Sequence, residues 1–234
     1  MSPGLITFDL DDTLWDVGSV ILRAEQTMAA WLDQYHPAWR RVGPDGLRTL
    51  RGEVLSARPD IAHALTALRL EVLRQTLQRA GLDRSQADTG ARGAFAAFFT
   101  ARNQVALFEH VRPVLTALAS QQPLYALSNG NADIIRAGLG DCFSAQFSAA
   151  SVGHAKPHPR MFEAALARAG VAAADAIHIG DHPEQDVAAA QAVGMRAIWV
   201  NFRGDEWPLA RRPDGEIRDF LALPGVIAGL RRQG

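Results

Sequence analysis

The alternation of apolar and polar positions predicts a buried β-strand near the start of the chain, followed by a long helical stretch. Residues 5–10 (LITFDL) form a short apolar run, β-branched in part, that ends in acidic residues. Such a run is typical of a strand whose carboxyl end meets solvent. From Asp16 on, apolar residues recur every three or four positions, which indicates amphipathic helices. Four are expected before residue 108: from Asp16 to about Pro37, around Leu47 to Val54, from Ile61 to Gly81 and from Ala87 to Arg102.

After residue 107 the pattern switches to short apolar runs that alternate with helical periodicity. We expect strands at 124–128, 146–149, 176–179 and 197–200, and helices at 111–120, 132–138, 157–169 and 185–193. Strands that alternate with helices indicate a parallel sheet covered on both faces. The predicted fold is therefore α/β. A Rossmann-like, doubly wound parallel sheet is formed by residues 1–14 and 108–234, and an α-helical cap domain is inserted at residues 15–107.

Composition narrows the class of protein without indicating a function. The 234 residues are 48% hydrophobic and 21% charged, with a net charge of −1, as in an ordinary globular protein. The balanced charge argues against a nucleic-acid partner, and no apolar run is long enough to cross a membrane. The single cysteine, Cys142, excludes an intramolecular disulfide. With no basic leader before Asp9, we expect a cytoplasmic protein. The sequence leaves its oligomeric state open.

The basic residues show one unusual bias: of the 24, only Lys156 is a lysine, and all others are arginine. A lysine ammonium is a compact point charge, whereas a guanidinium is a planar fork. A site that needs a point charge would explain why this position alone is lysine. Lys156 therefore becomes a candidate site residue.

Polar residues of complementary chemistry follow the predicted strands. Parallel α/β sheets bind ligands at the carboxyl ends of their strands, so the loops after these strands are expected to meet at one edge. These loops carry Asp9 and Asp11, Ser128 and Asn129, Lys156, and Asp181 with Asp186. The edge would thus combine carboxylates, one ammonium, one hydroxyl and several loop amides.

This set of groups favours phosphoryl chemistry assisted by a divalent cation. Carboxylates that lie close together repel one another and need a cation, and oxygen ligands without a Cys or His cluster suit Mg²⁺. Mg²⁺ and Lys156 would neutralise a phosphate group, while Ser128 and loop amides would hydrogen-bond its oxygens. One carboxylate can attack phosphorus. A second, two residues along, can protonate the leaving oxygen and then activate water.

Four short motifs, taken in their order along the chain, resemble those of the haloacid dehalogenase-like hydrolase superfamily. They are FDLDDTL at 8–14, Ser128-Asn129, Lys156-Pro157, and Gly180-Asp181 with Asp186. The helical insertion after the first motif resembles the helical-cap subclass. The resemblance implies a nucleophile at Asp9, a general acid and base at Asp11, and Mg²⁺ held by the Asp9 carboxylate, the Asp11 backbone carbonyl and Asp181. It further implies phosphate binding by Ser128, Asn129 and Lys156, with Thr13 and Asp186 orienting the reacting groups.

Several segments resemble more narrowly the bacterial phosphatases that act on FMN and on 5-amino-6-(5-phospho-D-ribitylamino)uracil, a riboflavin precursor. They include FDLDDTLWD, VILRAEQT, SNGNA and GMRAIWV. The expected activity is Mg²⁺-dependent hydrolysis of a small organic phosphate monoester through an aspartyl-phosphate, with the cap selecting the substrate. Candidate cap contacts are Trp15, Arg23, Trp31 and Trp39, although core packing is the favoured interpretation of Trp31. His182 departs from the pattern, because an acidic or small residue is expected after the Gly-Asp pair.

Other activities compete with this interpretation. A carbon–halogen hydrolase of the same superfamily needs a nucleophile like Asp9 but no second acid, so Asp11 argues against it. A sugar-phosphate mutase, or a phosphatase acting on phosphoglycolate or sugar phosphates, keeps both carboxylates and stays open.

A Mg²⁺-binding phospho-acceptor signalling module would be about half this length, with its acceptor on a mid-chain strand. ALSNG at 126–130 approaches a nucleophile elbow, but no well-spaced acid and histidine follow, and no glycine-rich P-loop is present.

Overall fold

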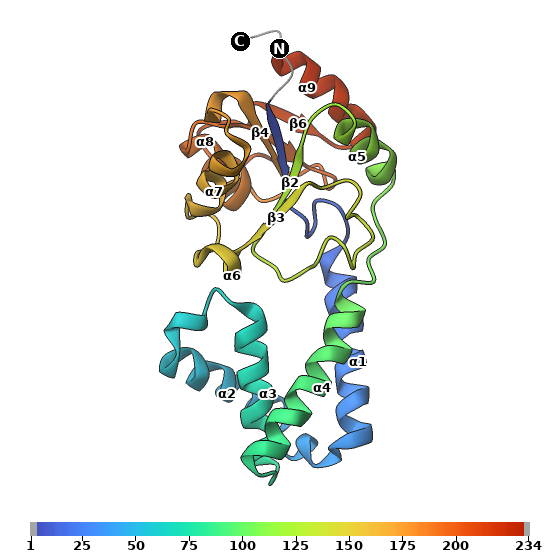
Figure 1. The fold of residues 1–234 in the computed structure, drawn as a ribbon, viewed down its shortest axis with the longest axis vertical. Helices are drawn as coiled ribbons and strands as arrows, with labels where there is room; N and C mark the ends of the chain where they lie inside the picture. Colours follow the sequence, from blue (N-terminus) through green and yellow to red (C-terminus); the bar gives the residue numbers. More distant parts are fainter. Residues whose placement is uncertain (1–3, 232–234) are drawn as a thin grey trace. The chain divides into compact units, whose positions relative to one another are not determined.

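The computed structural model describes residues 4–231, and the chain separates into two compact units. The chain up to Asp16 and from Ala106 onward forms one unit, which we call the core unit. Val17–Val105 form the other, the helical unit. Figure 1 shows the strands gathered in the core unit and the long helices of the helical unit.

Within residues 4–231 the core unit contains one six-stranded sheet, and every pair of neighbouring strands in it is parallel. The strands are β1 Leu5–Phe8, β2 Leu124–Ser128, β3 Ala145–Ser148, β4 Ala176–Gly180, β5 Arg196–Val200 and β6 Gly215–Ile217, in the spatial order β3-β2-β1-β4-β5-β6. β1, β2 and β4 are buried along their whole length, as their nearly continuous apolar sequences require. The predicted α/β fold with a parallel sheet is confirmed.

The strand order creates a topological switch point in the middle of the sheet. β1 and β4 are neighbours, yet the chain leaves β1 toward β2 on one side and leaves β4 toward β5 on the other. Connections that diverge from adjacent parallel strands open a crevice at the carboxyl ends of those strands, where open α/β sheets bind ligands. The loops after Phe8 and after Gly180 flank this crevice.

Helices cover both faces of the sheet. They are α5 Val111–Ala119, α6 Ala149–Val152, α7 Arg160–Ala169, α8 Ala189–Ala192 and α9 Leu223–Arg231, with α7 and α8 on one face and α5 and α9 on the other (Figure 1). The α7 face buries a cluster that includes Leu5, Leu127 and Phe162. Because side chains alternate along a strand, Leu5 and Thr7 share this face of β1, and Asp9 continues the series.

The helical unit, all of whose residues are described, consists of four α-helices and two 3₁₀ turns. The helices are α1 Val17–Tyr35, α2 Gly43–Ala57, α3 Leu65–Arg79 and α4 Arg84–Arg102, and the turns are Pro37–Arg41 and Pro59–Ile61. α1, α3 and α4 pack around a core that includes Met28, Leu77 and Phe98. α4 begins with a capping box between Asp83 and Gln86, each accepting from the other's backbone N–H, which satisfies two otherwise unpaired donors.

The helix predicted at 132–138 is wrong, and turns occupy the segment instead. The Asp133 carboxylate accepts from the backbone N–H of Ile135. The Gln146 side chain bonds the backbone on either side of Asp133. A helix over 132–138 would pair Ala132 O with the Arg136 N–H. Gln146 Nε2 takes that oxygen and the Asp133 carboxylate takes that N–H, at 3.2 Å, so this helical bond is not made. Gly138 then adopts a φ of +75°, a left-handed conformation that ends helical turns.

The C-terminal half differs from the prediction in three further ways. The single helix expected at 185–193 is a π-helical turn, Pro183–Ala188, that continues as α8. Short 3₁₀ turns occur at Ala173–Asp175 and Phe220–Ala222. Sequence periodicity does not reveal β6, which has three residues, or α9, whose proline and two glycines lower its helix propensity. No helix within residues 4–231 has both the length and the apolar character needed to cross a membrane.

Candidate active site

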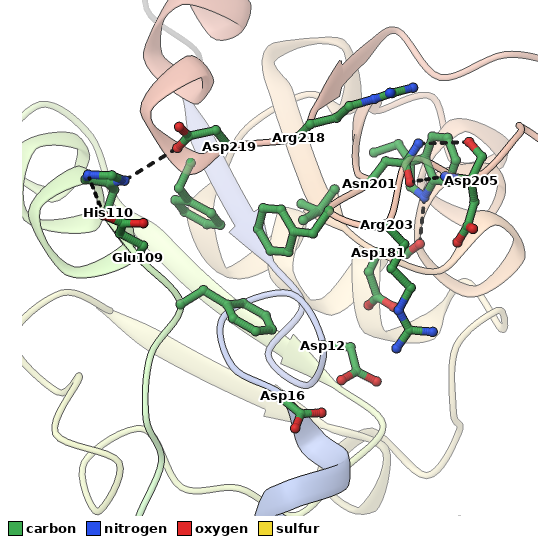
Figure 2. Close-up of a pocket in the computed structure, with 15 residues that line it drawn as sticks. Asp12, Asp16, Glu109, His110, Asp181, Asn201, Arg203, Asp205, Arg218 and Asp219 are labelled. Atoms are coloured by element: carbon green, nitrogen blue, oxygen red, sulfur yellow. Dashed lines mark hydrogen bonds and ion pairs between the residues drawn. The ribbon is translucent and has the colours of Figure 1, made fainter.

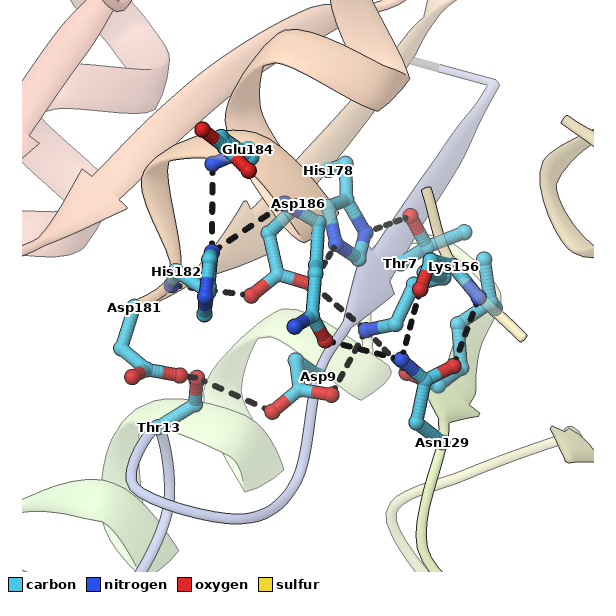
Figure 3. A network of polar contacts seen from close by, with 12 residues as sticks. Thr7, Asp9, Thr13, Asn129, Lys156, His178, Asp181, His182, Glu184 and Asp186 are labelled. Carbon is cyan, nitrogen blue, oxygen red and sulfur yellow. Dashed lines mark hydrogen bonds and ion pairs between the residues drawn. The ribbon is translucent and has the colours of Figure 1, made fainter. Parts of the chain in front are cut away.

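Asp9 lies at the carboxyl end of β1, beside the switch point. Its backbone N–H donates to Ile179 O at 2.8 Å, so pairing with β4 continues one residue past the strand and holds the Asp9 backbone. The residue is only 7% exposed. Asp9 Oδ1 accepts from Lys156 Nζ at 2.6 Å, and Oδ2 lies 3.4 Å from the Thr13 hydroxyl (Figure 3). Asp9 is therefore a buried carboxylate held at Oδ1 by the ammonium. The single hydrogen of the Thr13 hydroxyl is shared with Asp181 Oδ1, which is nearer at 3.1 Å, so Oδ2 remains the better placed oxygen for a metal ion.

Lys156 connects the loops of the site and uses all three of its N–H donors. Nζ donates to Asp9 Oδ1 at 2.6 Å, to Asp186 Oδ1 at 2.5 Å and to the backbone O of Leu127 at 2.8 Å. An ammonium has three donors, so this group, in a residue only 3% exposed, is fully hydrogen-bonded. A planar guanidinium does not present three hydrogens on one nitrogen. The geometry thus accounts for a lysine in a chain that otherwise uses arginine.

Asn129 holds the backbone of Lys156 in place. Its Oδ1 accepts from Lys156 N at 2.7 Å, and its Nδ2 donates to Lys156 O at 2.9 Å and to Gln185 Oε1 at 2.8 Å. The polar atoms of this side chain therefore contact protein groups. Ser128, buried at the end of β2, accepts from the Gly130 N–H at 2.9 Å. That bond leaves the hydroxyl hydrogen of Ser128 for another acceptor.

Asp186, on the π-helical turn, accepts hydrogen bonds at both oxygens. Oδ1 accepts from Lys156 and lies 3.2 Å from His178 Nε2, while Oδ2 accepts from the His182 N–H at 3.0 Å. The Asp186 side chain packs directly against the backbone of Gly180. Position 180 must be glycine, because a Cβ there would lie 2.4 Å from Asp186 Cγ. The glycine of the Gly-Asp motif therefore makes room for the carboxylate that holds Lys156.

Three carboxylates, those of Asp9, Asp181 and Asp186, offer oxygens within 4.8 Å of one another. The Thr13 hydroxyl lies 3.1 Å from Asp181 Oδ1 and 3.4 Å from Asp9 Oδ2, so it links two of them. Asp186 already has donors at both oxygens, which leaves Asp9 and Asp181 as the better placed ligands. This all-oxygen donor set fits Mg²⁺.

The crowding of acids shifts their pKa values in opposite directions. Burial raises the pKa of Asp9 well above its usual value, Asp186 and Asp181 add to the rise, and Lys156 opposes it. Burial and the charge of Asp186 also raise the pKa of Asp181, to about 7. Burial acts the same way on Asp186, but Lys156 and His178 outweigh it and hold its pKa below the usual range. The positive charge of Lys156 alone does not neutralise the three carboxylates, and this excess of negative charge favours a bound cation.

Asp11 lies two residues after Asp9 on the same loop, and Trp15 holds its carboxylate. Trp15 Nε1 donates to Asp11 Oδ1 at 2.8 Å, and the Asp12 N–H donates to Trp15 O at 2.8 Å. The turn between them places Asp12 at a φ of +59°, a conformation that Asp and Asn tolerate better than most residues. Trp15, predicted as a substrate contact, is completely buried and contacts Asp11.

The motifs brought together at this edge are those of a known family. A model of haloacid dehalogenase-like hydrolases matches residues 3–194, a range that contains every acid described above and Lys156. The chain belongs to this family. The six-stranded parallel sheet and the order of the motifs agree with that membership.

Relatives within the haloacid dehalogenase-like family include both phosphatases and dehalogenases. The chain is 34% identical to the 5-amino-6-(5-phospho-D-ribitylamino)uracil phosphatase YigB of Escherichia coli, over 95% of each chain. It is 38% identical to a phosphoserine phosphatase of Thermus thermophilus, over 66% of this chain and 64% of that one. A crystal structure described as 2-haloacid dehalogenase from Pseudomonas syringae pv. Tomato is 42% identical, covering 98% of this chain and 99% of the other, with a TM-score of 0.94.

The other candidate substrate contacts belong to the helical unit. The Arg23 guanidinium donates to the backbone O of Gln104. Trp31 packs beside the core of the unit, with its ring 4.7 Å from that of Tyr35, and Trp39 Nε1 donates to Asp33 Oδ1 at 2.9 Å. Their part in substrate selection stays a prediction.

Several polar residues of the network were not predicted from sequence, namely Thr7, His178, His182 and Gln185. Thr7 and His178 interrupt apolar strands and face each other in the register of β1 and β4. In the sequence, Thr7 and His178 each stand out as a polar residue within an apolar strand. That the two side chains meet depends on the register of β1 and β4. His182 Nδ1 accepts from the N–H groups of Glu184 and Gln185 at 3.2 Å. It therefore caps the π-helical turn, which explains the unexpected histidine after Asp181.

A cavity of about 580 Å³ lies within the core unit beside Asp181. Figure 2 shows Arg203 extending from the loop after β5 toward Asp181 and Asp12. Phe108 and Phe202 form an apolar wall, with their rings meeting edge-on at 5.0 Å between centroids. A cavity of this size and composition matches pockets that bind small molecules.

We expect the raised pKa of Asp181 to lower the stability of the metal-free protein as pH rises. The folded value is about 7, against about 3.9 in an unfolded chain. The folded state therefore binds the extra proton between about pH 4 and 7 and loses stability across that window as pH rises. Asp181→Asn removes this contribution. The difference in free energy of unfolding, Asp181→Asn minus wild type, should increase by on the order of 2 kcal/mol from pH 5 to pH 8.

Urea denaturation of both proteins with a chelator present measures this difference. An identical pH dependence in the two proteins would contradict the raised pKa.

Proposed function

We propose that the protein is a Mg²⁺-dependent phosphatase that hydrolyses a small organic phosphate monoester through an aspartyl-phosphate on Asp9. The observation that carries the proposal is the pair of acids on one loop. Asp9 is held by Lys156, and Asp11, two residues on, is held by the Trp15 indole. Ester cleavage at phosphorus needs both a nucleophile and a proton donor for the leaving oxygen, and this loop carries both.

The reaction divides into two phosphoryl transfers. In the first, an Asp9 oxygen attacks phosphorus, the ester P–O bond breaks, and Asp11 gives its proton to the leaving alkoxide. In the second, the ionised Asp11 takes a proton from water as that water attacks the aspartyl-phosphate. Inorganic phosphate leaves, and both acids return to their starting states.

Lys156 serves the nucleophile by position and by charge. Its bond to Asp9 Oδ1 opposes the effect of burial and favours the ionised carboxylate, which is the nucleophilic form. In this proposal the phosphoryl oxygens accept from the Ser128 hydroxyl and from the backbone N–H of Asn129. Lys156, whose three N–H donors bond Asp9, Asp186 and Leu127, helps bind the phosphate through its positive charge. The Asn129 side chain acts indirectly, since its polar atoms hold the backbone of Lys156.

Mg²⁺ would be held by Asp9, Asp181 and the backbone carbonyl of Asp11, and the clustered acidic oxygens support this assignment. When bound, Mg²⁺ neutralises charge on the phosphoryl oxygens and on the crowded carboxylates. Thr13, which touches both Asp9 and Asp181, orients the two carboxylate ligands.

The narrower proposal is that the substrate is FMN or 5-amino-6-(5-phospho-D-ribitylamino)uracil. Similarity to YigB across 95% of both chains supports it. We assign substrate selection to the helical cap at residues 15–107, with Arg23 as its candidate contact. The aromatic wall of the cavity beside Asp181 also suits a planar ring. A small-molecule substrate in the cytoplasm, with no nucleic-acid or membrane partner, remains the expectation from composition.

Carbon–halogen hydrolysis is the competing activity, because a solved relative at 42% identity is described as a 2-haloacid dehalogenase. In that reaction Asp9 would displace halide from carbon and form an ester that water then cleaves. A halide leaves without a proton, so a second acid has no role in its departure. The presence of Asp11, held in place by Trp15, therefore favours the phosphatase.

We expect the purified protein with Mg²⁺ to release inorganic phosphate from p-nitrophenyl phosphate. Asp9→Asn should abolish this release, because it removes the nucleophile. Asp11→Asn should lower kcat by about 10²- to 10⁴-fold, the usual contribution of a general acid or base. Asp45→Asn, at an exposed position of α2, is the matched control and should behave as wild type.

A halide-release assay on a 2-haloacid runs in parallel with the phosphate assay. Halide release without phosphate release would replace the proposed function with the dehalogenase.

The substrate proposal predicts the ranking of a panel of phosphate esters. FMN and the ribitylaminouracil phosphate should give higher kcat/KM than phosphoglycolate, phosphoserine and hexose phosphates, since only the first two offer a planar ring. Phosphate release at several concentrations of each ester measures the ranking. If both ring compounds fall below the hexose phosphates, the narrower assignment fails and the phosphatase assignment stands.

Lys156→Arg should cost both activity and stability. A guanidinium cannot donate to Asp9, Asp186 and Leu127 from one nitrogen, and its larger volume overfills a buried site, which costs roughly 1–3 kcal/mol. We expect turnover to fall by more than about 100-fold. Phosphate release and urea denaturation measure the two effects. Arg48→Lys, at an exposed position of α2, is the matched exchange of the same two residue types, and normal turnover in Lys156→Arg would disprove the role given to Lys156.

A further inference from the structure

A chain of buried hydrogen bonds runs from the interior of the sheet to Asp9, and its first two members have no part in the reaction proposed above. Thr7 Oγ1 lies 2.8 Å from His178 Nδ1, and His178 Nε2 lies 3.2 Å from Asp186 Oδ1. Asp186 accepts from Lys156, which donates in turn to Asp9. Figure 3 shows these residues joined in that order.

Among residues 4–231, Thr7 and Asp186 are the polar partners of the His178 ring nitrogens. β1 and β4 pair with Thr7 opposite His178. The Phe162 ring of α7 meets the imidazole edge-on, with 5.0 Å between centroids. His178 is completely buried, so neither ring nitrogen reaches solvent. Buried polar atoms are normally hydrogen-bonded, and here Thr7 and Asp186 satisfy one nitrogen each.

The partners determine which nitrogen carries the hydrogen. Asp186 is held ionised by Lys156 and His178, and an ionised carboxylate only accepts, so His178 Nε2 must donate to it. The Thr7 hydroxyl has one hydrogen and two acceptors within reach, His178 Nδ1 at 2.8 Å and Ile177 O at 3.4 Å. The shorter distance favours Nδ1 as the acceptor of that hydrogen. Burial lowers the pKa of His178, which agrees with a neutral ring.

We propose that His178 is a positioning residue: a neutral imidazole with its hydrogen on Nε2 holds the Asp186 carboxylate in the orientation that keeps Lys156 against Asp9. Asp186 Oδ1 is shared between Nε2 and the ammonium. Without the imidazole donor, Oδ1 has Lys156 alone. Only the His182 N–H at Oδ2 then opposes a turn of the carboxylate that would draw the ammonium away from Asp9. The inference rests on the proposed function, because its catalytic consequence is the placement of Asp9.

Three substitutions separate the donor from the bulk of the ring. In His178→Gln the amide nitrogen lies as many bonds from Cβ as Nε2 does, so the donor to Asp186 is kept. In His178→Asn the amide nitrogen takes the place of Nδ1, so that donor is lost, and His178→Leu removes both nitrogens. Ile177→Val changes a buried residue of the same strand whose side chain points to the other face. It is the matched control for a small change in packing.

Steady-state phosphate release separates positioning from substrate binding. His178→Leu and His178→Asn should lower kcat by about 10- to 100-fold, as when a group that orients a site ligand is removed, with KM little changed. His178→Gln should recover most of kcat, and Ile177→Val should match wild type. Equal losses in the Gln and Leu variants would overturn the proposal, because the donor would then not be what matters.

Labelling with ¹⁵N-lysine gives a second readout that does not depend on turnover, because Lys156 is the only lysine in the chain. Hydrogens on its Nζ should exchange slowly in wild type and in His178→Gln, and faster in the Leu and Asn variants. In ¹⁵N-histidine spectra, the signals that disappear in His178→Gln belong to His178 and should show a hydrogen on Nε2 only. A hydrogen on Nδ1, or unchanged Nζ exchange in the Leu and Asn variants, would overturn the proposal.

The two readouts also distinguish failure of the inference from failure of the proposed function. If wild type releases no phosphate from any ester, the proposed function fails, and the Nζ exchange of the resting protein still decides the role of His178. If His178→Leu does not fold, the Gln and Asn variants, which are both polar amides, carry the comparison.

Discussion

A single buried ammonium between two carboxylates is the interaction on which the site depends. Lys156 donates to Asp9 after β1, to Asp186 after β4 and to the backbone of Leu127 in β2, so one side chain ties together three neighbouring strands. Burying charges in this way is costly unless each one is paired and hydrogen-bonded. The surrounding structure meets that condition: Asn129 holds the lysine backbone, and Gly180 leaves the space that Asp186 fills.

The clustering of the acids follows from sequence alone, because parallel strands that alternate with helices bring their carboxyl ends to one edge. Burial and register do not follow in the same way. The sequence predicts a phosphate-binding role for Lys156, but not the three protein acceptors that its ammonium bonds in the structure. Thr7 and His178 meet only through the register of two strands more than 160 residues apart. The apolar spacing of residues 132–138 predicts a helix. In the structure, the side chains of Asp133 and Gln146 form hydrogen bonds with the backbone of this segment instead.

Relatives of this chain are described both as phosphatases and as a dehalogenase, and both kinds of reaction can begin with attack by a carboxylate. The chemistry diverges at the leaving group. An alkoxide needs a proton, whereas a halide does not, so the residue two positions after the nucleophile carries the distinction. Here Trp15, completely buried, binds the Asp11 carboxylate. In the proposed phosphatase reaction, Trp15 therefore acts by orienting the Asp11 carboxylate as well as by packing.

The central position of β1 also bears on the order in which the site forms during synthesis. β1 emerges from the ribosome first, but its two partners begin at Leu124 and Ala176, after the entire helical unit. The nascent chain therefore carries Asp9, the proposed nucleophile, through synthesis of the whole helical unit before a neighbouring strand exists. Contacts between residues so distant in sequence are slow to form. A chain interrupted before β4 contains Asp9 and Lys156 but lacks the second carboxylate that holds the ammonium in place.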